Sequence, residues 1–399
     1  MTVISYTLDK CQKCMKCLHA CPTGAISLQD YRVKIDNEKC TNCATCMESC
    51  VSQGLQAKGS TLADLENYEY NIALVSTAIF GECSSLNQAE SLMLAIKKLG
   101  FDEVINLSSY DGAMYEEMVR YVGVNHQQTT LIASFCPTVN RLIEVRYPIL
   151  LSNIVPFDYI CEVAARDIRE KRTELPKNTG IFLLSECVAK LTLAKYPYGN
   201  KYSSIDHAMI LADLFPQISR NLSTEGLPTT INDKGLCNVT GGLYERDFND
   251  KKVVIADGMA KVITALELAE FDRLKDCDLL FLSGCINGCI GGNLLWGNPY
   301  SSANNIKLLI KEANETVANI NNNDLYGVTI ASTFNEKRSL QERLATFIKI
   351  NEYVEKLPGY DCGACGFHSC RAMAEEILAK RATFNDCRIL RGDGIKHEN

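Results

Sequence analysis

Two cysteines in a glycine-rich stretch, Cys285 and Cys289, have the type and spacing that suit metal chemistry. The stretch, residues 283–292, contains four glycines and follows a short apolar run at residues 278–282. Glycine lets the backbone approach a bulky inorganic centre closely, and thiolate ligands suit iron–sulfur clusters or zinc. Two thiols are half of what a cluster needs, so either two more cysteines join them from elsewhere or the pair is structural.

Two runs near the N-terminus have the spacing of a bacterial ferredoxin module with two 4Fe–4S clusters. Each run reads C-x2-C-x2-C-x3-C, and its fourth cysteine binds the cluster of the other run. One predicted cluster is held by Cys11, Cys14, Cys17 and Cys50, and the second by Cys40, Cys43, Cys46 and Cys21. Val51 stands where the second run usually has proline, which leaves the thiol count unchanged. Two zinc sites are the alternative, but this repeated spacing is not a zinc-finger spacing.

A third group of thiols lies near the C-terminus. Its members are Cys362, Cys365, Cys370 and Cys387. Glycines stand at the tight turns beside Cys362 and Cys365. We therefore expect a separate 4Fe–4S cluster here, with zinc as the alternative.

The segments between these groups must position the thiols. Apolar runs typical of strands alternate with helical periodicity, which indicates an α/β fold with a mostly parallel sheet. Strands are expected at 71–78, 103–107, 129–134, 179–185, 252–256 and 278–282, and helices at 86–99, 110–122, 139–148, 157–171 and 260–270.

Three of the expected strands end in cysteine, at Cys136, at Cys187 and at the Cys285/Cys289 pair. Because ligands of open α/β sheets bind beyond the carboxyl ends of the strands, we expect these four thiols to converge on one cluster. The remaining cysteines have no such setting and are interpreted as small buried hydrophobic residues. They are Cys83, Cys161, Cys237 and Cys277.

The domain organisation follows from these patterns. We expect a ferredoxin-like two-cluster module at 1–56, an α/β domain at 68–303, a linker or loop at 304–338 and a small helical 4Fe–4S domain at 339–399. The last begins with a capping-box pattern at Ser339 and Glu342 that opens a helix to about Lys356.

Composition excludes several classes of protein. The 399 residues are 46% apolar and 22% charged with a net charge of -7 and no long basic run, which disfavours a nucleic-acid partner. No apolar run reaches the roughly 18 residues of a membrane helix, and no signal peptide is visible. The 20 cysteines, grouped at short spacing, favour metal sites in a reducing cytoplasm over a disulfide framework.

Residues 1 to about 303 resemble an iron–iron (FeFe) hydrogenase, a ferredoxin module followed by an H-cluster domain. Residues 133–137 resemble the family's Thr-Ser-Cys-Cys-Pro motif, with Ser134 at the shared serine, and residues 185–190 resemble Met-Pro-Cys-x-x-Lys. Residues 259–289 resemble the third motif, and 238–245 resemble a Thr/Ser-Gly-Gly-Val-x-Glu segment. The last sixty or so residues resemble the small cluster domain of corrinoid iron–sulfur proteins.

The resemblance implies an H-cluster, a 4Fe–4S cluster joined to a two-iron unit with CO, CN and a dithiolate bridge, in addition to three ordinary 4Fe–4S clusters. By analogy Cys136, Cys187 and Cys285 hold the cubane, and Cys289 also bridges to the two-iron unit. Lys190 takes the place of a lysine that hydrogen-bonds a cyanide, although a solvated lysine is the plain alternative. The segment that faces the cyanides corresponds to Ser76, Thr77 and Ala78, without the family's proline.

Three departures from the family pattern bear on activity. Phe135 replaces the cysteine that relays protons, and Ser185 and Ser283 replace two methionines that contact the two-iron unit. Hydroxyl donors there are expected to change the cluster's hydrogen bonding and potential. These changes favour the family's sensory branch, with slow turnover. The nearest candidate proton carriers, each equally readable as an ordinary surface acid, are Glu116, Glu117 and Glu245.

The expected function is interconversion of H2 with protons and electrons in an anaerobe, slow and H2-sensing, with a ferredoxin-type acceptor. One alternative is an iron–sulfur scaffold or assembly adaptor, and another is an electron-transfer subunit, both without the two-iron unit. No G-x-G-x-x-G follows a strand, so no dinucleotide site is expected. Expected partners are a redox protein such as ferredoxin, or a signalling protein, and maturation enzymes; a homodimer is left open.

Overall fold

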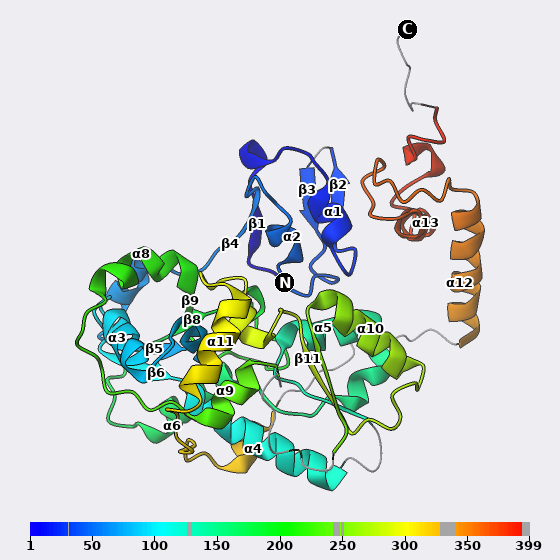
Figure 1. The fold of residues 1–399 in the computed structure, drawn as a ribbon. Helices are drawn as coiled ribbons and strands as arrows, with labels where there is room; N and C mark the ends of the chain where they lie inside the picture. The colour runs from blue at the N-terminus through cyan, green and yellow to red at the C-terminus, as the bar shows by residue number, and fades with distance from the viewer. Residues whose placement is uncertain (31, 126–129, 242–247, 249–250, 328–339, 393–399) are drawn as a thin grey trace.

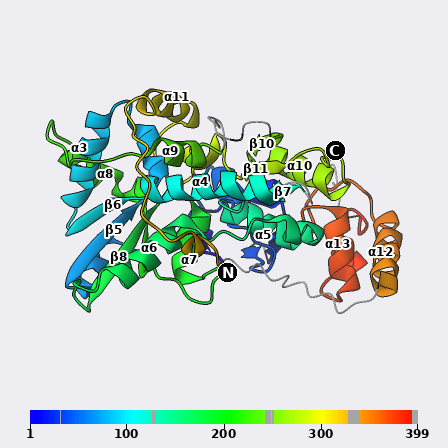
Figure 2. The ribbon, with the colours of Figure 1, turned by 90° about the horizontal axis from the view of Figure 1, so that it is seen from below.

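The computed structural model describes residues 1–30, 32–125, 130–241, 248, 251–327 and 340–392 (Figure 1). An N-terminal module lies beside a large α/β part, and a small helical part at the C-terminus lies next to the N-terminal module (Figure 1). Viewed from below, the larger sheet and the helices α12 and α13 stand at opposite ends of an elongated molecule (Figure 2). Among the described helices, none has the length and apolar character needed to cross a membrane.

The N-terminal module is built from two similar halves. Strand β1 (Ile4–Tyr6) pairs antiparallel with β4 (Leu55–Ala57), and β2 (Ile26–Gln29) with β3 (Arg32–Ile35). The short helices are η1 (Leu8–Lys10), α1 (Lys16–Ala20) and α2 (Thr45–Glu48). Residues at matched positions of the two cysteine runs have a positive φ, 57° and 56° at Lys13 and Asn42, and 61° at both Met15 and Ala44. This conformation is uncommon outside glycine, and its recurrence shows that both runs wrap in the same way.

The larger sheet of the α/β part has four parallel strands in the order β6-β5-β8-β9. They are β5 (Tyr70–Val75), β6 (Glu103–Asn106), β8 (Thr179–Ser185) and β9 (His207–Ile210). Every residue of β8 is buried, as expected for a strand covered on both faces. Helices α3 (Leu86–Lys97) and α8 (Leu211–Asn221) cover one face, and α4 (Ser108–Asn125), α6 (Ile160–Lys171) and α7 (Val188–Lys195) cover the other.

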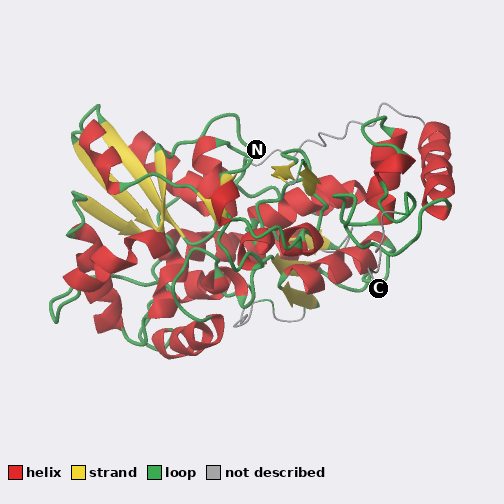
Figure 3. Ribbon diagram, turned by 90° about the horizontal axis from the view of Figure 1, so that it is seen from above, coloured by secondary structure: helices red, strands yellow, loops and turns green. Residues whose placement is uncertain are grey.

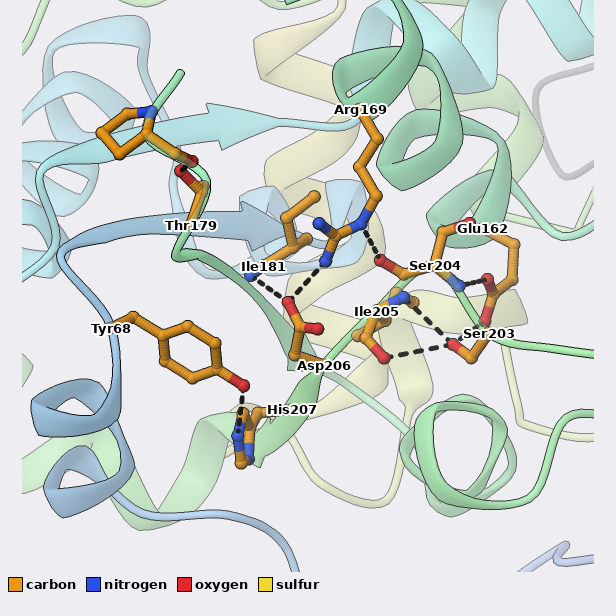
Figure 4. Close-up of polar contacts among 11 residues, drawn as sticks. Tyr68, Glu162, Arg169, Thr179, Ile181, Ser203, Ser204, Ile205, Asp206 and His207 are labelled. Atoms are coloured by element: carbon orange, nitrogen blue, oxygen red, sulfur yellow. Dashed lines mark hydrogen bonds and ion pairs between the residues drawn. The ribbon is translucent and has the colours of Figure 1, made fainter. Parts of the chain in front are cut away.

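A polar network fixes the start of β9, a strand that the sequence patterns did not predict. A carboxylate oxygen of Asp206 accepts hydrogen bonds from the backbone N of Ile181 at 2.7 Å and from Arg169 at 2.6 Å (Figure 4). The next residue, His207, hydrogen-bonds the hydroxyl of Tyr68 at 3.1 Å (Figure 4). These contacts join β9 to β8 and α6.

The smaller sheet is separate from the larger one (Figure 3). Its parallel strands lie in the order β10-β11-β7 and are β7 (Leu131–Ile132), β10 (Val253–Asp257) and β11 (Leu279–Ser283). Helices α5 (Pro137–Arg146) and α10 (Met259–Glu270) pack against it in their own apolar cluster. Another apolar core contains side chains from both sheets and from the N-terminal module, so this module is packed onto the α/β part.

The expected boundary at residue 303 falls inside helix α11 (Pro299–Leu309). The segment that follows it, expected as a linker, is packed on the α/β part as far as Gly327. The backbone N of Asn314 donates to the carbonyl of Ile231 at 2.9 Å, and that of Asp158 donates to the carbonyl of Leu325 at 2.8 Å. Residues 328–338 lie outside the described part of the chain.

The other short elements are η2 (Leu62–Asn67), η3 (Thr77–Glu82), η4 (Pro148–Asn153), α9 (Asp233–Val239), η5 (Gly288–Gly291) and η6 (Asn322–Leu325). The C-terminal part contains α12 (Leu340–Glu355), α13 (Cys370–Leu378) and η7 (Phe384–Asp386). Its small apolar core is centred on Leu357, Met373, Ala374 and Cys387. A core of this size gives little stability by itself, so bound metal would contribute to its folding.

Candidate functional site

The four strand-end cysteines meet between the two sheets. Cys187 follows β8 of the larger sheet as the N-cap of α7, and Cys136 follows β7 of the smaller sheet as the N-cap of α5. Cys285 follows β11, and Cys289 lies in η5. Each thiol therefore lies in a segment that follows the carboxyl end of a parallel strand, where open α/β sheets bind their ligands.

The electrostatics of these thiols fit a metal cluster. Burial raises the pKa of all four, and the nearby Cys136 and Cys289 raise that of Cys285 further. Mutual effects of this kind require the thiols to lie close together. Buried neighbouring thiolates are unfavourable without a cation, and iron ions supply that charge. The backbone N of Lys190 also donates to the sulfur of Cys187 at 3.4 Å, a contact that supports a thiolate ligand.

The ferredoxin-like module repeats such contacts in both halves. The backbone N of Ala25 donates to the sulfur of Cys21, and that of Gly54 donates to the sulfur of Cys50, each at 3.2 Å. Both donors stand four residues after the fourth cysteine of a run. Among the described side chains, no group of three His, Cys, Asp or Glu is arranged to hold a single metal ion. In a cubane each thiolate binds a different iron, so thiols that hold one need not touch.

Lys190 lies beside the thiol expected to bridge. Its ammonium is 2.6 Å from Glu186 and 3.9 Å from the sulfur of Cys289. Burial lowers the pKa of Lys190, but Cys289 and Glu186 raise it more, so it lies well above its ordinary value. The second carboxylate oxygen of Glu186 is buried and has no partner among the described residues. The solvated-lysine alternative does not hold, because the side chain of Lys190 is only 14% exposed.

A small cavity adjoins this lysine. It is lined by Asp111, Met114, Phe135, Asp158, Ile160, Lys190, Asn238, Val239 and Cys289. Phe135 contributes a ring without an exchangeable proton, held against Phe281 at 4.7 Å between ring centroids. The neighbouring Ser134 gives its hydroxyl to the carbonyl of Phe157 at 3.1 Å. Neither side chain of this pair therefore offers a free proton to the cavity.

Asp111 is a residue of the cavity that the sequence analysis missed. Its carboxylate accepts hydrogen bonds from the hydroxyl of Thr77 at 2.6 Å and from the amide of Asn238 at 2.9 Å. Burial raises the pKa of Asp111 to about 6, against the lowering effects of Lys190 and these two hydrogen bonds. A signal was present, because Asp111 is in helical register with the buried Met114 and Met118. A carboxyl group on the apolar stripe of a helix has to be paired.

The other residues of the first turn of η3 are also buried near the site. Ser76 caps η3 by accepting from the backbone N of Ala78 at 3.4 Å, and both residues are buried with Thr77. Only Thr77 among these three has a described bond to a residue that lines the cavity. Its hydroxyl is thus the polar group that this segment directs toward the site.

Ser185 and Ser283, which stand where the family has methionines, donate their hydrogen bonds to nearby backbone carbonyls. The hydroxyl of Ser185 donates to the carbonyl of Cys187 at 2.9 Å, and that of Ser283 to the carbonyl of Cys285 at 3.2 Å. Each serine therefore uses its one proton to hold the turn that carries a thiol. The expectation that they act as donors toward a bound two-iron unit is not supported by this geometry.

The glutamates suggested as proton carriers are engaged elsewhere. Glu117 is buried and bonded to Arg120, to the hydroxyl of Tyr326 and to Asn322, which holds its pKa below the ordinary value although burial alone would raise it. Glu116 pairs with Lys234 at 2.8 Å. Neither lines the cavity as described, and Glu245 lies outside the described residues.

The C-terminal thiols surround a space of their own. Cys362, Cys365, Cys370 and Cys387 all line one cavity, together with Phe367 and Met373. Cys370 opens α13 and Cys387 follows η7. Burial raises the pKa of Cys365. The remaining cysteines, Cys83, Cys161, Cys237 and Cys277, are buried in apolar clusters, as the sequence indicated.

Comparisons with known protein families match three successive segments of the chain. Residues 10–53 match the family model of the 4Fe-4S dicluster domain, and residues 357–389 match that of an Fe-S cluster domain. Between them, residues 69–221 match the model of the iron only hydrogenase large subunit, C-terminal domain. That match includes Cys136, Cys187 and Lys190.

Similarity to individual proteins is more distant. The uncharacterized protein MJ0119 of Methanocaldococcus jannaschii is 39% identical over 49 residues, which are 12% of this chain and 22% of that protein. The chain therefore matches about a fifth of the length of this relative. Among solved structures, a variant of the FeFe-hydrogenase HydA1 from Chlamydomonas reinhardtii shares 14% identity at a TM-score of 0.48, over 61% of this chain and 87% of that one. The same values apply to HydA(deltaEFG), from a study of stepwise H-cluster assembly.

The matched segments stand in one order, a two-cluster domain, a hydrogenase domain and a further cluster domain. The cysteine runs and the strand-end thiols described above lie in these segments or directly beyond them. The chain thus contains a segment that matches the iron only hydrogenase domain, placed between a 4Fe-4S dicluster domain and a further iron–sulfur domain.

Proposed function

We propose that this protein interconverts H2 with protons and electrons at a low rate and serves as an H2 sensor. The observation that carries the proposal is the pairing of Lys190 with Cys289, 3.9 Å apart, in a cavity closed on one side by Phe135. An H-cluster bound to the four strand-end thiols would supply the H2 chemistry. The chain holds a buried cation beside the bridging thiol and offers no proton relay at residue 135.

The residues around the site have separable roles. Lys190 supplies positive charge and hydrogen-bond donors, which suit an anionic cyanide in a site of low dielectric. Phe135 excludes water and protons from its side of the cavity. Asp111, held by Thr77 and Asn238, is the described acid that lines the cavity without an ion-pair partner within hydrogen-bonding distance.

Electrons from H2 would leave through the ferredoxin-like module. Oxidation of one H2 at a bound H-cluster would yield two protons and two electrons, and iron–sulfur centres held by the module's cysteines would accept the electrons singly. The side chain of Asn293 links the two regions, since its nitrogen donates to the carbonyl of Cys43 and its oxygen accepts from the backbone N of Val188, each at 3.3 Å. Val188 is next to Cys187, so the hydrogen-bonded path joins a cluster ligand on each side.

Infrared spectroscopy after anaerobic maturation tests the proposal. We expect CO and CN bands in the wild type, and loss of those bands in Lys190→Ala with the cubane signals retained. Lys195→Ala, an exposed change on the same helix, is the matched control. A matured protein that contains all its cubanes but shows no CO or CN bands would refute H2 chemistry at this site.

A second function is favoured by one observation. The ammonium of Lys190 already has a carboxylate partner, Glu186, at 2.6 Å, so its burial is explained without a cyanide. A scaffold or electron-transfer protein with a cubane alone at the four thiols would keep this pair. The same infrared spectrum separates the two functions, because only the two-iron unit has CO and CN groups.

The sensing role rests on the missing relay together with the extra C-terminal cluster. In an H2 sensor, the state with H2 bound must differ from the H2-free state in its affinity for a partner. We expect hydrogen exchange of residues 304–399 to differ between protein under H2 and under argon. Fast turnover, with no H2-dependent change in that segment, would leave an ordinary enzyme.

A further inference from the structure

The C-terminal cluster domain is seated directly on the ferredoxin-like module (Figures 1 and 2). The backbone N of Leu28, in β2, donates to the carbonyl of Gly366 at 2.9 Å. The side chains of Lys39 and Glu376 form an ion pair at 3.7 Å across the same junction. Segments more than 330 residues apart in sequence thus contact each other at this junction.

Two histidines fit over two glycines at this junction. A Cβ atom on Gly363 would lie 2.9 Å from Nε2 of His19, and one on Gly24 would lie 2.2 Å from Cε1 of His368. A side chain at either glycine would therefore require the facing histidine to move. Both glycines also have a positive φ, 62° at Gly24 and 73° at Gly363, so a substitution would be strained in any case.

Two of these four residues lie between cysteines that are predicted to bind clusters. His19 stands between Cys17 and Cys21, and Gly363 stands between Cys362 and Cys365. The contact therefore joins the segment between two predicted ligands of one domain to the segment between two predicted ligands of the other. A cavity of about 630 Å³ at the junction is lined by Cys11 and Cys365, so thiols of both domains also face one space.

We propose that the C-terminal centre exchanges electrons directly with the ferredoxin-like module across this junction, through the His19–Gly363 and His368–Gly24 contacts. Each transfer moves one electron, so one centre is oxidised as the other is reduced, and no bond or proton changes place. Electron tunnelling falls steeply with distance, and two ligand loops in van der Waals contact give a short path. The proposed H2 function enters only as the source of electrons, and dithionite can replace it.

The junction also gives the proposed centres an order along the molecule. The bridge of Asn293 joins the second cysteine run to the strand-end site, and the C-terminal domain contacts the first run and the turn after Cys21. The ferredoxin-like module thus lies between the two outer centres.

Paramagnetic resonance of the dithionite-reduced full-length protein tests this. We expect magnetic coupling between the reduced C-terminal cluster and the clusters of the ferredoxin-like module, and its disappearance in Cys365→Ala. The variant with Lys39→Glu and His368→Ala together, which places like charges at Glu376 and empties the contact over Gly24, should lose the coupling while keeping its iron. Lys58→Glu, an exposed change in the same module, should leave the coupling intact.

Two results would overturn the proposal. One is an uncoupled C-terminal signal in wild-type protein whose clusters are all reduced. The other is a zero-length carbodiimide reaction that fails to link Lys39 to Glu376 in wild-type protein, a measurement that does not depend on a variant folding. Coupling after dithionite without any reduction by H2 would refute the proposed H2 function and leave the junction standing.

Discussion

The hydroxyl of Thr77 donates a 2.6 Å hydrogen bond to the carboxylate of Asp111, in the buried wall of the cavity that also contains Lys190 and Cys289. Thr77 begins η3 after the first strand of the larger sheet, and Asp111 lies in the first turn of α4 after the second. The segments that follow two adjacent strands thus bring a hydroxyl and a carboxyl group together beside the site.

Replacing Asp111 by asparagine should change how stability depends on pH. Burial raises the pKa of Asp111 from its ordinary 3.8 to about 6, so its contribution to stability is full below pH 3.8 and is lost as the pH rises to 6. Above pH 6 the charged form costs about 3 kcal/mol, taking about 1.4 kcal/mol per pH unit. Asp111→Asn should therefore raise the free energy of unfolding at pH 8 by about 1–3 kcal/mol.

Thermal unfolding of the wild type and Asp111→Asn at pH 4, 6 and 8 measures this effect. Asp9→Asn, an exposed change in the ferredoxin-like module, is the control and should leave the pH profile unaltered. If Asp111→Asn unfolds with the wild-type dependence between pH 4 and 6, the carboxyl group is not held as the contacts indicate.

Phe135→Cys should speed proton exchange at the proposed H2 site. Phe135 lines the same cavity as Asp111 and has no exchangeable proton, whereas a thiol there would carry one. A positioned proton-transfer group typically contributes about 10²–10⁴-fold. We expect H/D exchange between D2 and water to rise toward this range, with unchanged infrared bands. Phe135→Leu, which changes packing without adding a proton, should remain slow. An exchange rate equal in both variants would mean that proton delivery does not limit the rate.

Lys190→Met should destabilise the protein as well as the cofactor. The change leaves Glu186, whose side chain is 0% exposed, without its cation. Breaking a buried ion pair by removing one partner typically costs about 3–5 kcal/mol. The double variant Lys190→Met with Glu186→Gln removes both charges and should recover much of that loss. Equal stability of the single and double variants would show that the ion pair contributes little.

Cys365→Ala should remove one cluster and leave the others. The cysteine motifs supply ligands for four cubanes, about sixteen irons at four per cluster before any two-iron unit is added. We expect the variant to lose about four irons and to keep the infrared bands of the strand-end site. Loss of those bands in folded protein would contradict a separate C-terminal cluster. Cys83→Ala, in an apolar cluster, serves as the control for iron content.

The cluster ligands were readable from the sequence because their information is local. Cysteines at C-x2-C spacing lie in one loop whatever the rest of the chain does, and the strand before Cys187 is a continuous apolar run that matched β8 residue for residue. The helices predicted from periodicity at residues 86–99 and 260–270 correspond to α3 (Leu86–Lys97) and α10 (Met259–Glu270). Parallel pairing followed from the alternation of strands and helices.

Other features depended on contacts between distant segments. The division into two sheets, with the site between them, arises from pairing of β7 with β11 rather than with β5 or β8. Residues 304–338 were predicted as a linker or loop from their asparagine-rich composition. The backbone of residues 304–327 nevertheless bonds to distant parts of the fold, since the backbone N of Asn314 donates to the carbonyl of Ile231.

The chemistry of individual side chains was decided last. The hydroxyl of Ser185 could donate either into the site or to its own turn. In the structure it donates to the carbonyl of Cys187, two residues further along the chain. Glu117 became an ion-pair partner because Arg120 and Tyr326 converge on it, the second from 209 residues away. Spacing along the chain determines which residues can bind a metal, whereas packing determines which acid, hydroxyl or second domain stands beside it.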